Sequence, residues 1–235
     1  MEIQPGLELI DLGLLVKSRK TLIIGDLHIG YEEALNKQGI LVPRFSFNQL
    51  LDRLQKIMKQ ADPKTVVING DIKHEFGEIS DQEWRDTLKI IDLITKSSKL
   101  ILIRGNHDKI LGPIAKKRDV DVKDYMMIED IYICHGHKIP EDSDFKKAEI
   151  IIIGHEHPAI TLEDGARQEK FKCFLLGKFR RKNLIVLPSM NLFVEGTDIL
   201  KEKLLSPFLS QRLGDFRVFV VEDKVYDFGK VRNIS

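Results

Sequence analysis

One junction recurs along this chain and constrains its fold: a short apolar run stops, and polar side chains follow at once. Runs of this length and content are typical of buried strands in mostly parallel sheets. Ligands of open α/β sheets bind beyond the carboxyl ends of the strands, so we expect the polar clusters of all five runs to meet at one site. The runs are Thr21–Gly25, Thr65–Gly70, Leu100–Gly105, Ile131–Cys134 and Ile150–Gly154.

The side chains that follow these runs are those of a metal site. They are Asp26-Leu27-His28, Asp71 with His74, Asn106-His107-Asp108, His135, and His155-Glu156-His157. Imidazole and carboxylate groups suit Mn, Fe, Zn or Ni, and no thiolate is offered. One carboxylate can bridge two ions, and two ions ~3.5–4 Å apart can clamp the attacking and leaving oxygens of a phosphate. If both D-x-H and H-x-H segments are extended, the two side chains of each pair lie on the same side.

The order of the predicted elements indicates the fold class. The first half alternates strand and helix: an apolar repeat predicts a helix over Ser46–Ala61, and a capping box at Ser80 opens another helix that ends near Lys96. The second half consists of short apolar runs between turn residues, which predicts mostly strands. We expect an α/β (α+β) protein in which residues 1–235 form one domain with two packed sheets.

Composition limits the compartment and the partners. The chain has 37 Lys and Arg against 36 Asp and Glu, so its net charge creates no overall field that attracts nucleic acid or a membrane. A local basic patch would still be enough to bind a nucleic acid. No apolar run approaches the ~20 residues of a membrane span, and the start does not resemble a signal peptide. Cys134 and Cys173 lie inside apolar runs, which favours buried free thiols. We expect a cytoplasmic protein without a membrane partner.

Taken together, the five polar clusters resemble the calcineurin-like metallophosphoesterase superfamily. Its pattern runs D-x-H, G-D, G-N-H-D or E, a single His, and G-H-x-H, and this chain has all five blocks in that order. The resemblance implies a four-layer αββα sandwich, in which helices flank two mixed β-sheets. It also implies two divalent ions, Mn first, with Fe, Zn, Ni and Mg as alternatives.

The resemblance assigns a role to each residue. A first ion would be held by Asp26, His28 and His157, and a second ion by Asn106, His135 and His155. Asp71 would bridge the two ions. A hydroxide bridging the ions would attack phosphorus in line. His107 would contact the phosphate and help to protonate the leaving group, and Asp108 would orient His107.

His74 makes the resemblance more specific to one branch of the superfamily. The string Gly70-Asp71-Ile72-Lys73-His74 is similar to the SbcD branch of DNA-repair nucleases, in which such a His is a second phosphate-side group. The longer string Gly-Asp-Ile-Lys-His-Glu-Phe-Gly, residues 70–77, is more similar to the archaeal SbcD-related and the bacterial DNA-ligase-associated phosphoesterases. The implied substrate is a nucleotide or nucleic-acid phosphodiester. A DNA-processing partner such as a helicase or a ligase is compatible with this resemblance, although no segment has a partner-binding signature.

Two other functions stay open. The same metal site would serve a phosphomonoesterase or a nucleotide pyrophosphatase, because substrate choice lies in the loops around the ligands. Some members of the superfamily are non-catalytic protein-binding scaffolds, such as a subunit of the retromer coat, but their key residues are altered and here all are present. A single strand-end Asp is usually a turn or a helix cap, and a single His usually packs. These interpretations are weak for seven residues in the family's order.

Overall fold

The computed structural model describes residues 1–40, 46–74, 80–108, 112–165 and 167–234. Among these residues, the first sheet consists of β1 (Glu2–Gln4), β2 (Leu7–Ile10), β3 (Gly13–Val16), β4 (Thr21–Ile24), β5 (Thr65–Asn69), β6 (Lys99–Ile103) and β7 (Asp121–Lys123), in that order across the sheet. Strands β1 to β4 pair antiparallel, and β4 to β7 pair parallel. The sheet is therefore mixed, with a parallel half that points its carboxyl ends to one edge.

The second sheet is also mixed. Its strands are β8 (Tyr125–Ile128), β9 (Ile131–Cys134), β10 (Ile150–Ile153), β11 (Pro158–Asp164), β12 (Arg167–Phe179), β13 (Lys182–Val186), β14 (Thr197–Asp198), β15 (Arg217–Val221) and β16 (Val225–Lys230). Strands β9, β10 and β13 run parallel, while β12 pairs antiparallel with β11, β13 and β15. Consequently β9 and β10 also end at a common edge.

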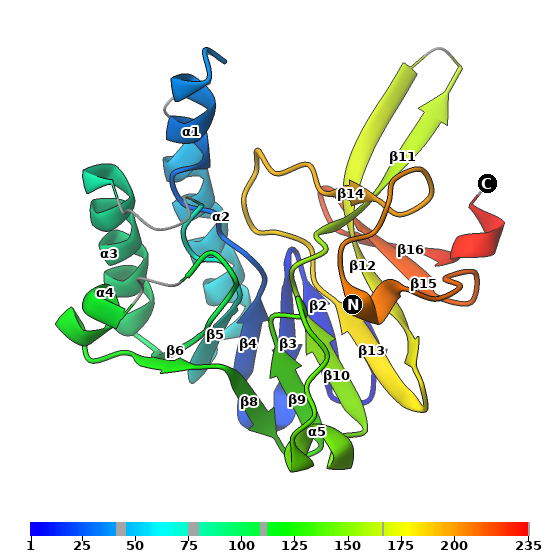
Figure 1. Cartoon of the computed structure of the whole chain (residues 1–235), viewed down its shortest axis with the longest axis horizontal. Coiled ribbons are helices and arrows are strands. Elements are labelled where there is room, and N and C mark those ends of the chain that lie inside the picture. Colours follow the sequence, from blue (N-terminus) through cyan, green and yellow to red (C-terminus); the bar gives the residue numbers. More distant parts are fainter. Residues whose placement is uncertain (41–45, 75–79, 109–111, 166, 235) are drawn as a thin grey trace.

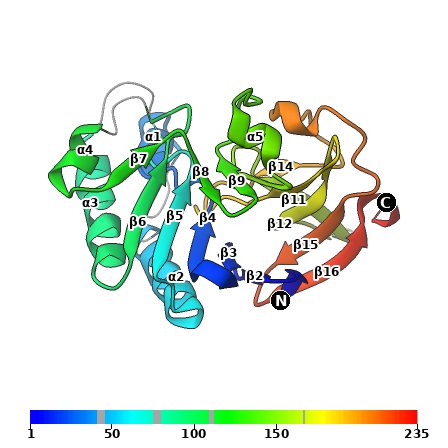
Figure 2. The ribbon, with the colours of Figure 1, turned by 90° about the horizontal axis from the view of Figure 1, so that it is seen from below.

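Helices flank the two sheets, as the resemblance implies. They are α1 (Tyr31–Lys37), α2 (Ser46–Ala61), α3 (Asp81–Thr95), α4 (Gly112–Lys117) and α5 (Ser143–Lys147). Figure 1 and Figure 2 show α1 to α4 together beside the first sheet and α5 beside the second. The predicted capping box is present, because the Ser80 hydroxyl accepts from the Glu83 N–H and the Glu83 carboxylate accepts from the Ser80 N–H. No helix in the described ranges has the length and apolar character needed to cross a membrane.

The second sheet is buried on both faces. One cluster of buried side chains joins the two sheets and contains Val67 of β5 and Phe174 of β12. Another covers the opposite face of the second sheet and contains Cys173 of β12 and Phe145 of α5. Because neighbouring residues of a strand point to opposite faces, Cys173 and Phe174 belong to different clusters. Both cysteines are buried free thiols, as their apolar surroundings predict.

The structure confirms the expected fold class: two mixed sheets flanked by helices. The helix predicted over Ser46–Ala61 has those bounds. Several elements were not predicted, among them α1, α4, α5 and the short strand β7. Each is short, so its sequence has too few apolar repeats to produce a periodic signal.

Candidate metal centre and active site

The polar clusters lie together because parallel strands deliver them to one edge. Strands β4, β5 and β6 are neighbours in the first sheet, and β9 and β10 are neighbours in the second. The two edges are also tied to each other: the Asn69 side chain at the end of β5 donates to the Cys134 carbonyl at the end of β9, at 2.9 Å. The expectation that five strand ends form one site is therefore met by the geometry.

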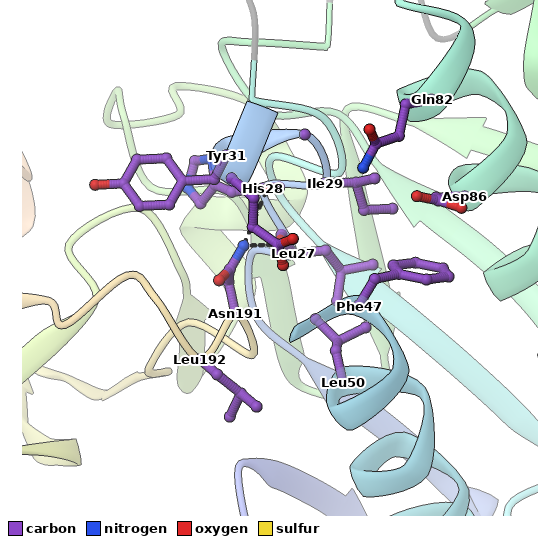
Figure 3. Close-up of a pocket in the computed structure, with 12 residues that line it drawn as sticks. Leu27, His28, Ile29, Tyr31, Phe47, Leu50, Gln82, Asp86, Asn191 and Leu192 are labelled. Atoms are coloured by element: carbon purple, nitrogen blue, oxygen red, sulfur yellow. Dashed lines mark hydrogen bonds between the residues drawn. The ribbon is translucent and has the colours of Figure 1, made fainter. Parts of the chain in front are cut away.

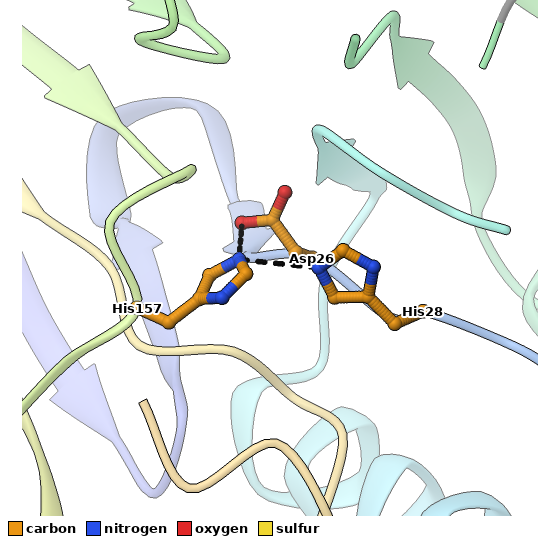
Figure 4. Close-up of side chains that lie close together, drawn as sticks. All are labelled: Asp26, His28 and His157. Carbon is orange, nitrogen blue, oxygen red and sulfur yellow. Dashed lines mark hydrogen bonds and ion pairs between the residues drawn. The ribbon is translucent and has the colours of Figure 1, made fainter. Parts of the chain in front are cut away.

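Asp26, His28 and His157 form the first cluster (Figure 4). The ring nitrogens His28 Nε2 and His157 Nε2 lie 3.4 Å apart, and His157 Nε2 lies 3.0 Å from Asp26 Oδ2. Asp26 is fully buried, and its Oδ1 accepts from the Asp71 N–H at 2.9 Å. One metal-binding atom from each of the three residues lies within 4.8 Å of the others.

Asp71, His135 and His155 form the second cluster, again with ligand atoms within 4.8 Å of one another. His135 Nε2 is at its centre, 3.5 Å from Asp71 Oδ2, 3.1 Å from His155 Nδ1 and 2.9 Å from Asn106 Oδ1. The other nitrogen of His135, Nδ1, lies 3.2 Å from Asp26 Oδ1, so the two clusters are contiguous.

This donor set fits divalent ions better than it fits hydrogen bonding alone. A ring nitrogen carries at most one hydrogen, yet His135 Nε2 faces three polar atoms within 3.5 Å. The glycines before the clusters leave room for this convergence. A Cβ on Gly105 would lie 1.9 Å from Asp71 Oδ1, and a Cβ on Gly70 would lie 2.2 Å from His135 Nδ1.

The backbone of the D-x-H and H-x-H segments differs from the extended conformation that was expected. Extended geometry was predicted to place both side chains of each pair on one side, but His28, His155 and His157 have left-handed backbones, with φ of 43°, 64° and 49°. The strands end before these residues, at Ile24 and Ile153. As a result His155 and His157 separate, one into each cluster, while Asp26 and His28 stay together.

His107 and His74 lie beside the clusters. The His107 ring is 5.9 Å from the His74 ring and 5.5 Å from the His28 ring, measured between centroids. His107 Nδ1 donates to the His74 carbonyl at 2.5 Å, and the His107 N–H donates to Asp71 Oδ1 at 2.8 Å. These bonds orient the ring, whose Nε2 lies 3.7 Å from Asp71 Oδ2.

Asp108 is fully buried and binds backbone amides. Its carboxylate accepts from the N–H groups of Gly105, Ile72 and Lys73, at 3.1–3.4 Å. It therefore joins the loop after β5 to the loop after β6. The His107 ring is oriented by its bond to the His74 carbonyl, and the role expected for Asp108 remains a proposal.

Burial sets the protonation of the ligands. The pKa of His28 is lowered well below its usual value and that of His155 is lowered to about 4, in both cases mainly by burial, so both rings are neutral, which is the form of histidine that can bind a metal. Burial raises the pKa of Asp26, but His157 and His135 beside it outweigh burial and hold that pKa well below its usual value. Burial, helped by Asp26 and Asp108, raises the pKa of Asp71 to about 7.

Some residues that support the site were not predicted as site residues. Ser189 and Asn191 hold the backbone of the D-x-H segment, and Figure 3 shows the Asn191 amide directed at the Leu27–His28 backbone. The Tyr31 ring packs edge-on to His74, with centroids 4.7 Å apart. Glu156, between the two histidines, is in neither ligand group, and its carboxylate accepts from the N–H groups of Leu205 and Ser206.

An open cavity adjoins the second cluster. It has a volume of about 350 Å³ and is lined by His135, His137, Lys138, Tyr125 and their neighbours. The exposed ring of His137 lies 5.3 Å from that of His135. His137 belongs to neither of the two ligand groups.

These features define a class: a mixed α/β sandwich with two adjoining clusters of His and carboxylate ligands, beside a further pair of histidines. Residues 19–166 match the family described as calcineurin-like phosphoesterase, and the chain belongs to that family. The family consists of dinuclear-metal hydrolases that act on phosphate esters, and the two clusters are the candidate metal sites.

Solved structures resemble this chain over most of its length. The Pseudomonas putida nuclease MPE is 22% identical with a TM-score of 0.67, and the match covers 94% of each chain. The E. coli phosphoesterase Yfce is 13% identical with a TM-score of 0.44, covering 92% of this chain and 99% of Yfce. At this identity, the likeness to MPE shows a shared fold. No curated protein matches the sequence significantly.

Proposed function

We propose that this protein is a phosphodiesterase that cleaves nucleotide or nucleic-acid phosphodiesters with the help of two divalent ions, Mn by preference. The observation that carries the proposal is the contact between the two ligand clusters, in which His135 lies 3.2 Å from Asp26 and 3.5 Å from Asp71. One ion would be held by Asn106, His135 and His155 and the other by Asp26, His28 and His157, and Asp71 would bridge them. Bound ions would supply Lewis acidity and a water of lowered pKa.

His107 is proposed to protonate the leaving oxygen. Because Nδ1 donates to the His74 carbonyl, the neutral ring presents an unprotonated Nε2 on its other side. Burial lowers the pKa of His107, so the free ring is mostly neutral at pH 7. A phosphate anion beside the ring favours its protonated form, and the protonated Nε2 can then give its hydrogen to the leaving oxygen.

His74 supports a diester over a monoester. Hydrolysis of either ester expels one alkoxide, but a diester keeps a second ester oxygen on phosphorus, and a second imidazole beside the phosphate can donate to that oxygen. We propose that the protein belongs with the SbcD-related and DNA-ligase-associated phosphoesterases, where this His recurs. The similarity in fold to a nuclease is compatible with that placement. A helicase or a ligase would be a partner of the expected kind.

Two further expectations become proposals here. We propose that residues 1–235 act as one metallophosphoesterase domain, since a single buried cluster contains side chains from both sheets. We also propose a cytoplasmic location, since both cysteines are free thiols and a reducing compartment preserves them.

The test is hydrolysis of model esters in the presence of Mn. Wild-type protein should cleave bis-p-nitrophenyl phosphate faster than p-nitrophenyl phosphate. The His107→Ala and Asp71→Asn variants should each lose at least about 100-fold in rate, whereas His137→Ala, which removes a nearby histidine outside the ligand groups, should stay near wild type. A preference for the monoester would favour a phosphomonoesterase. A protein that binds no metal and cleaves neither ester would favour a scaffold.

A further inference from the structure

Lys172 lies on the inner face of β12, two residues before Phe174, whose side chain is in the core between the sheets. Its ammonium donates to the Ser189 carbonyl at 2.8 Å and also to the Asn191 carbonyl. No carboxylate in the described part of the chain lies within ion-pair distance of this ammonium. The guanidinium of Arg53 acts on this ammonium as a like charge, and Arg53 is itself bound to Asp11. The Lys172 ammonium therefore binds the backbone of the turn at 189–191 and does not form an ion pair with a described carboxylate.

That turn holds the backbone of the D-x-H segment. The Met190 N–H and the Ser189 hydroxyl both donate to the Asp26 carbonyl at 2.9 Å. The Asn191 amide donates to the Leu27 carbonyl at 2.9 Å and to the His28 carbonyl at 3.0 Å. Three consecutive carbonyls of the segment are thus bound by three consecutive residues of the turn. Both Ser189 and Asn191 are buried.

The segment needs such support. His28 has a φ of 43°, a left-handed conformation that costs free energy in a residue with a side chain and persists where the surroundings enforce it. The approach is also close at Gly25, because a Cβ there would lie 2.4 Å from the Pro188 carbonyl oxygen. A shift of the turn would therefore be transmitted to Asp26 and His28.

We propose that Lys172 is a positioning residue for the first metal ion: by binding the Ser189 and Asn191 carbonyls, it fixes the turn that presents Asp26 and His28. This inference rests on the metal site of the proposed function. The hydrogen bonds described for the 189–191 turn reach the D-x-H segment and not the side chains of Asp71 or His135. Lys172 should therefore affect the two ions unequally.

The chemistry of Lys172 agrees with this role. Burial, together with Arg53, lowers the pKa of Lys172 to about 7, so the protein tolerates an unfavourable burial of this amine. An apolar side chain of similar length would avoid that penalty but would leave two inward-facing carbonyls without a donor. The amine donates N–H groups to the carbonyls whether or not it is protonated.

The experiment is a Mn²⁺ titration of the metal-free protein, followed by calorimetry. In Lys172→Met, the dissociation constant of one ion should rise about 10- to 100-fold, the range typical when a group that orients a metal ligand is lost, while that of the other ion stays at its wild-type value. In a His155→Ala background, which disables the second site, the loss should persist. In a His157→Ala background, which disables the first site, it should vanish. Hydrolysis by Lys172→Met should recover when Mn²⁺ is raised.

A matched control exists in Lys182, whose ammonium also binds two backbone carbonyls, those of Lys146 and Ala148, at the C-terminal end of α5. Lys182→Met should leave both dissociation constants unchanged. Amide exchange of Met190 in EDTA supplies a readout that needs no metal, and it should be faster in Lys172→Met. If Lys172→Met does not fold, Lys172→Gln serves instead.

The proposal would be overturned if Lys172→Met bound both ions with wild-type affinity and its Met190 amide kept wild-type protection. It would also be overturned if Lys182→Met changed the dissociation constants as much as Lys172→Met does. A wild-type protein that binds two Mn²⁺ ions but cleaves no phosphodiester would refute the proposed function alone, because the affinity comparison would still decide the role of Lys172. A wild-type protein that binds no Mn²⁺ would refute both.

Discussion

Replacing Gly105 by Ala should disable the metal centre while leaving most of the fold in place. The new Cβ would lie 1.9 Å from Asp71 Oδ1, more than 1 Å closer than the 3.0 Å below which real Cβ contacts essentially do not occur. The backbone nitrogen of Asp71 would lie 2.6 Å away, so a rotation of the Asp71 side chain alone cannot relieve the clash. Asp71 must move by about 1 Å, and its bond from the His107 N–H, now 2.8 Å, must break or stretch.

A misplacement of about 1 Å in a catalytic site can cost on the order of 100-fold in rate. We therefore expect kcat/KM for bis-p-nitrophenyl phosphate to fall at least that far in Gly105→Ala. Overpacking of a buried site typically costs about 1–3 kcal/mol of unfolding free energy, so the variant should still fold. The assay is steady-state hydrolysis with saturating Mn, and urea denaturation of the same samples measures the stability.

Gly214→Ala is the control, since its Cβ would meet its nearest neighbour, the Arg232 Cβ, at an ordinary 3.6 Å. This variant should match wild type in both rate and stability. The reasoning would be refuted if Gly105→Ala retained nearly full activity, because Asp71 would then not need the position that the geometry gives it.

Three further predictions follow from separate parts of the molecule. Ser80→Ala removes one half of a capping box and should lower the unfolding free energy by about 1 kcal/mol, with little change in kcat; urea titration and kinetics check this. Chelation should abolish hydrolysis, and Mn²⁺ at 100 times its dissociation constant should stabilise the protein by about 2.7 kcal/mol for each ion bound; a thermal melt without any Mn-dependent shift would contradict it. Lys172 has a folded pKa of about 7 against 10.5 in the unfolded chain, so the unfolded chain binds more protons between these values and the unfolding free energy should rise with pH there. That rise should be smaller in Lys172→Met when urea unfolding is compared at pH 7 and pH 9.

Much of the fold was accessible from local sequence patterns. The helix over Ser46–Ala61 has the predicted bounds, and the strand over Thr65–Asn69 lies within the predicted run Thr65–Gly70, because each is long or apolar enough to stand out in the sequence. Elements such as α5 and β7 were missed, since five or three residues contain too little repetition to identify. Their structure depends on neighbours that the local sequence does not contain.

The ligand types and their order could likewise be predicted from the residues, whereas their partition between two ions came from the family resemblance and not from the spacing of the residues. The sequence places His155 and His157 two residues apart, and an extended segment would have kept them together. Left-handed backbone at both residues sends them to different clusters. Backbone conformation of this kind is imposed by packing and hydrogen bonds around a loop, so it has no marker in the loop itself.

The sequence by itself determined which chemical groups are available and at which strand ends they occur, because apolar runs and the residues that follow them are local properties. Only the tertiary structure decided which groups meet. It brought the β4, β5 and β6 ends against those of β9 and β10, and it placed Lys172 and Asn191, more than 140 residues after Asp26, behind the D-x-H segment. The physical reason is that such contacts depend on the pairing of distant strands, which is settled by burial across the whole molecule.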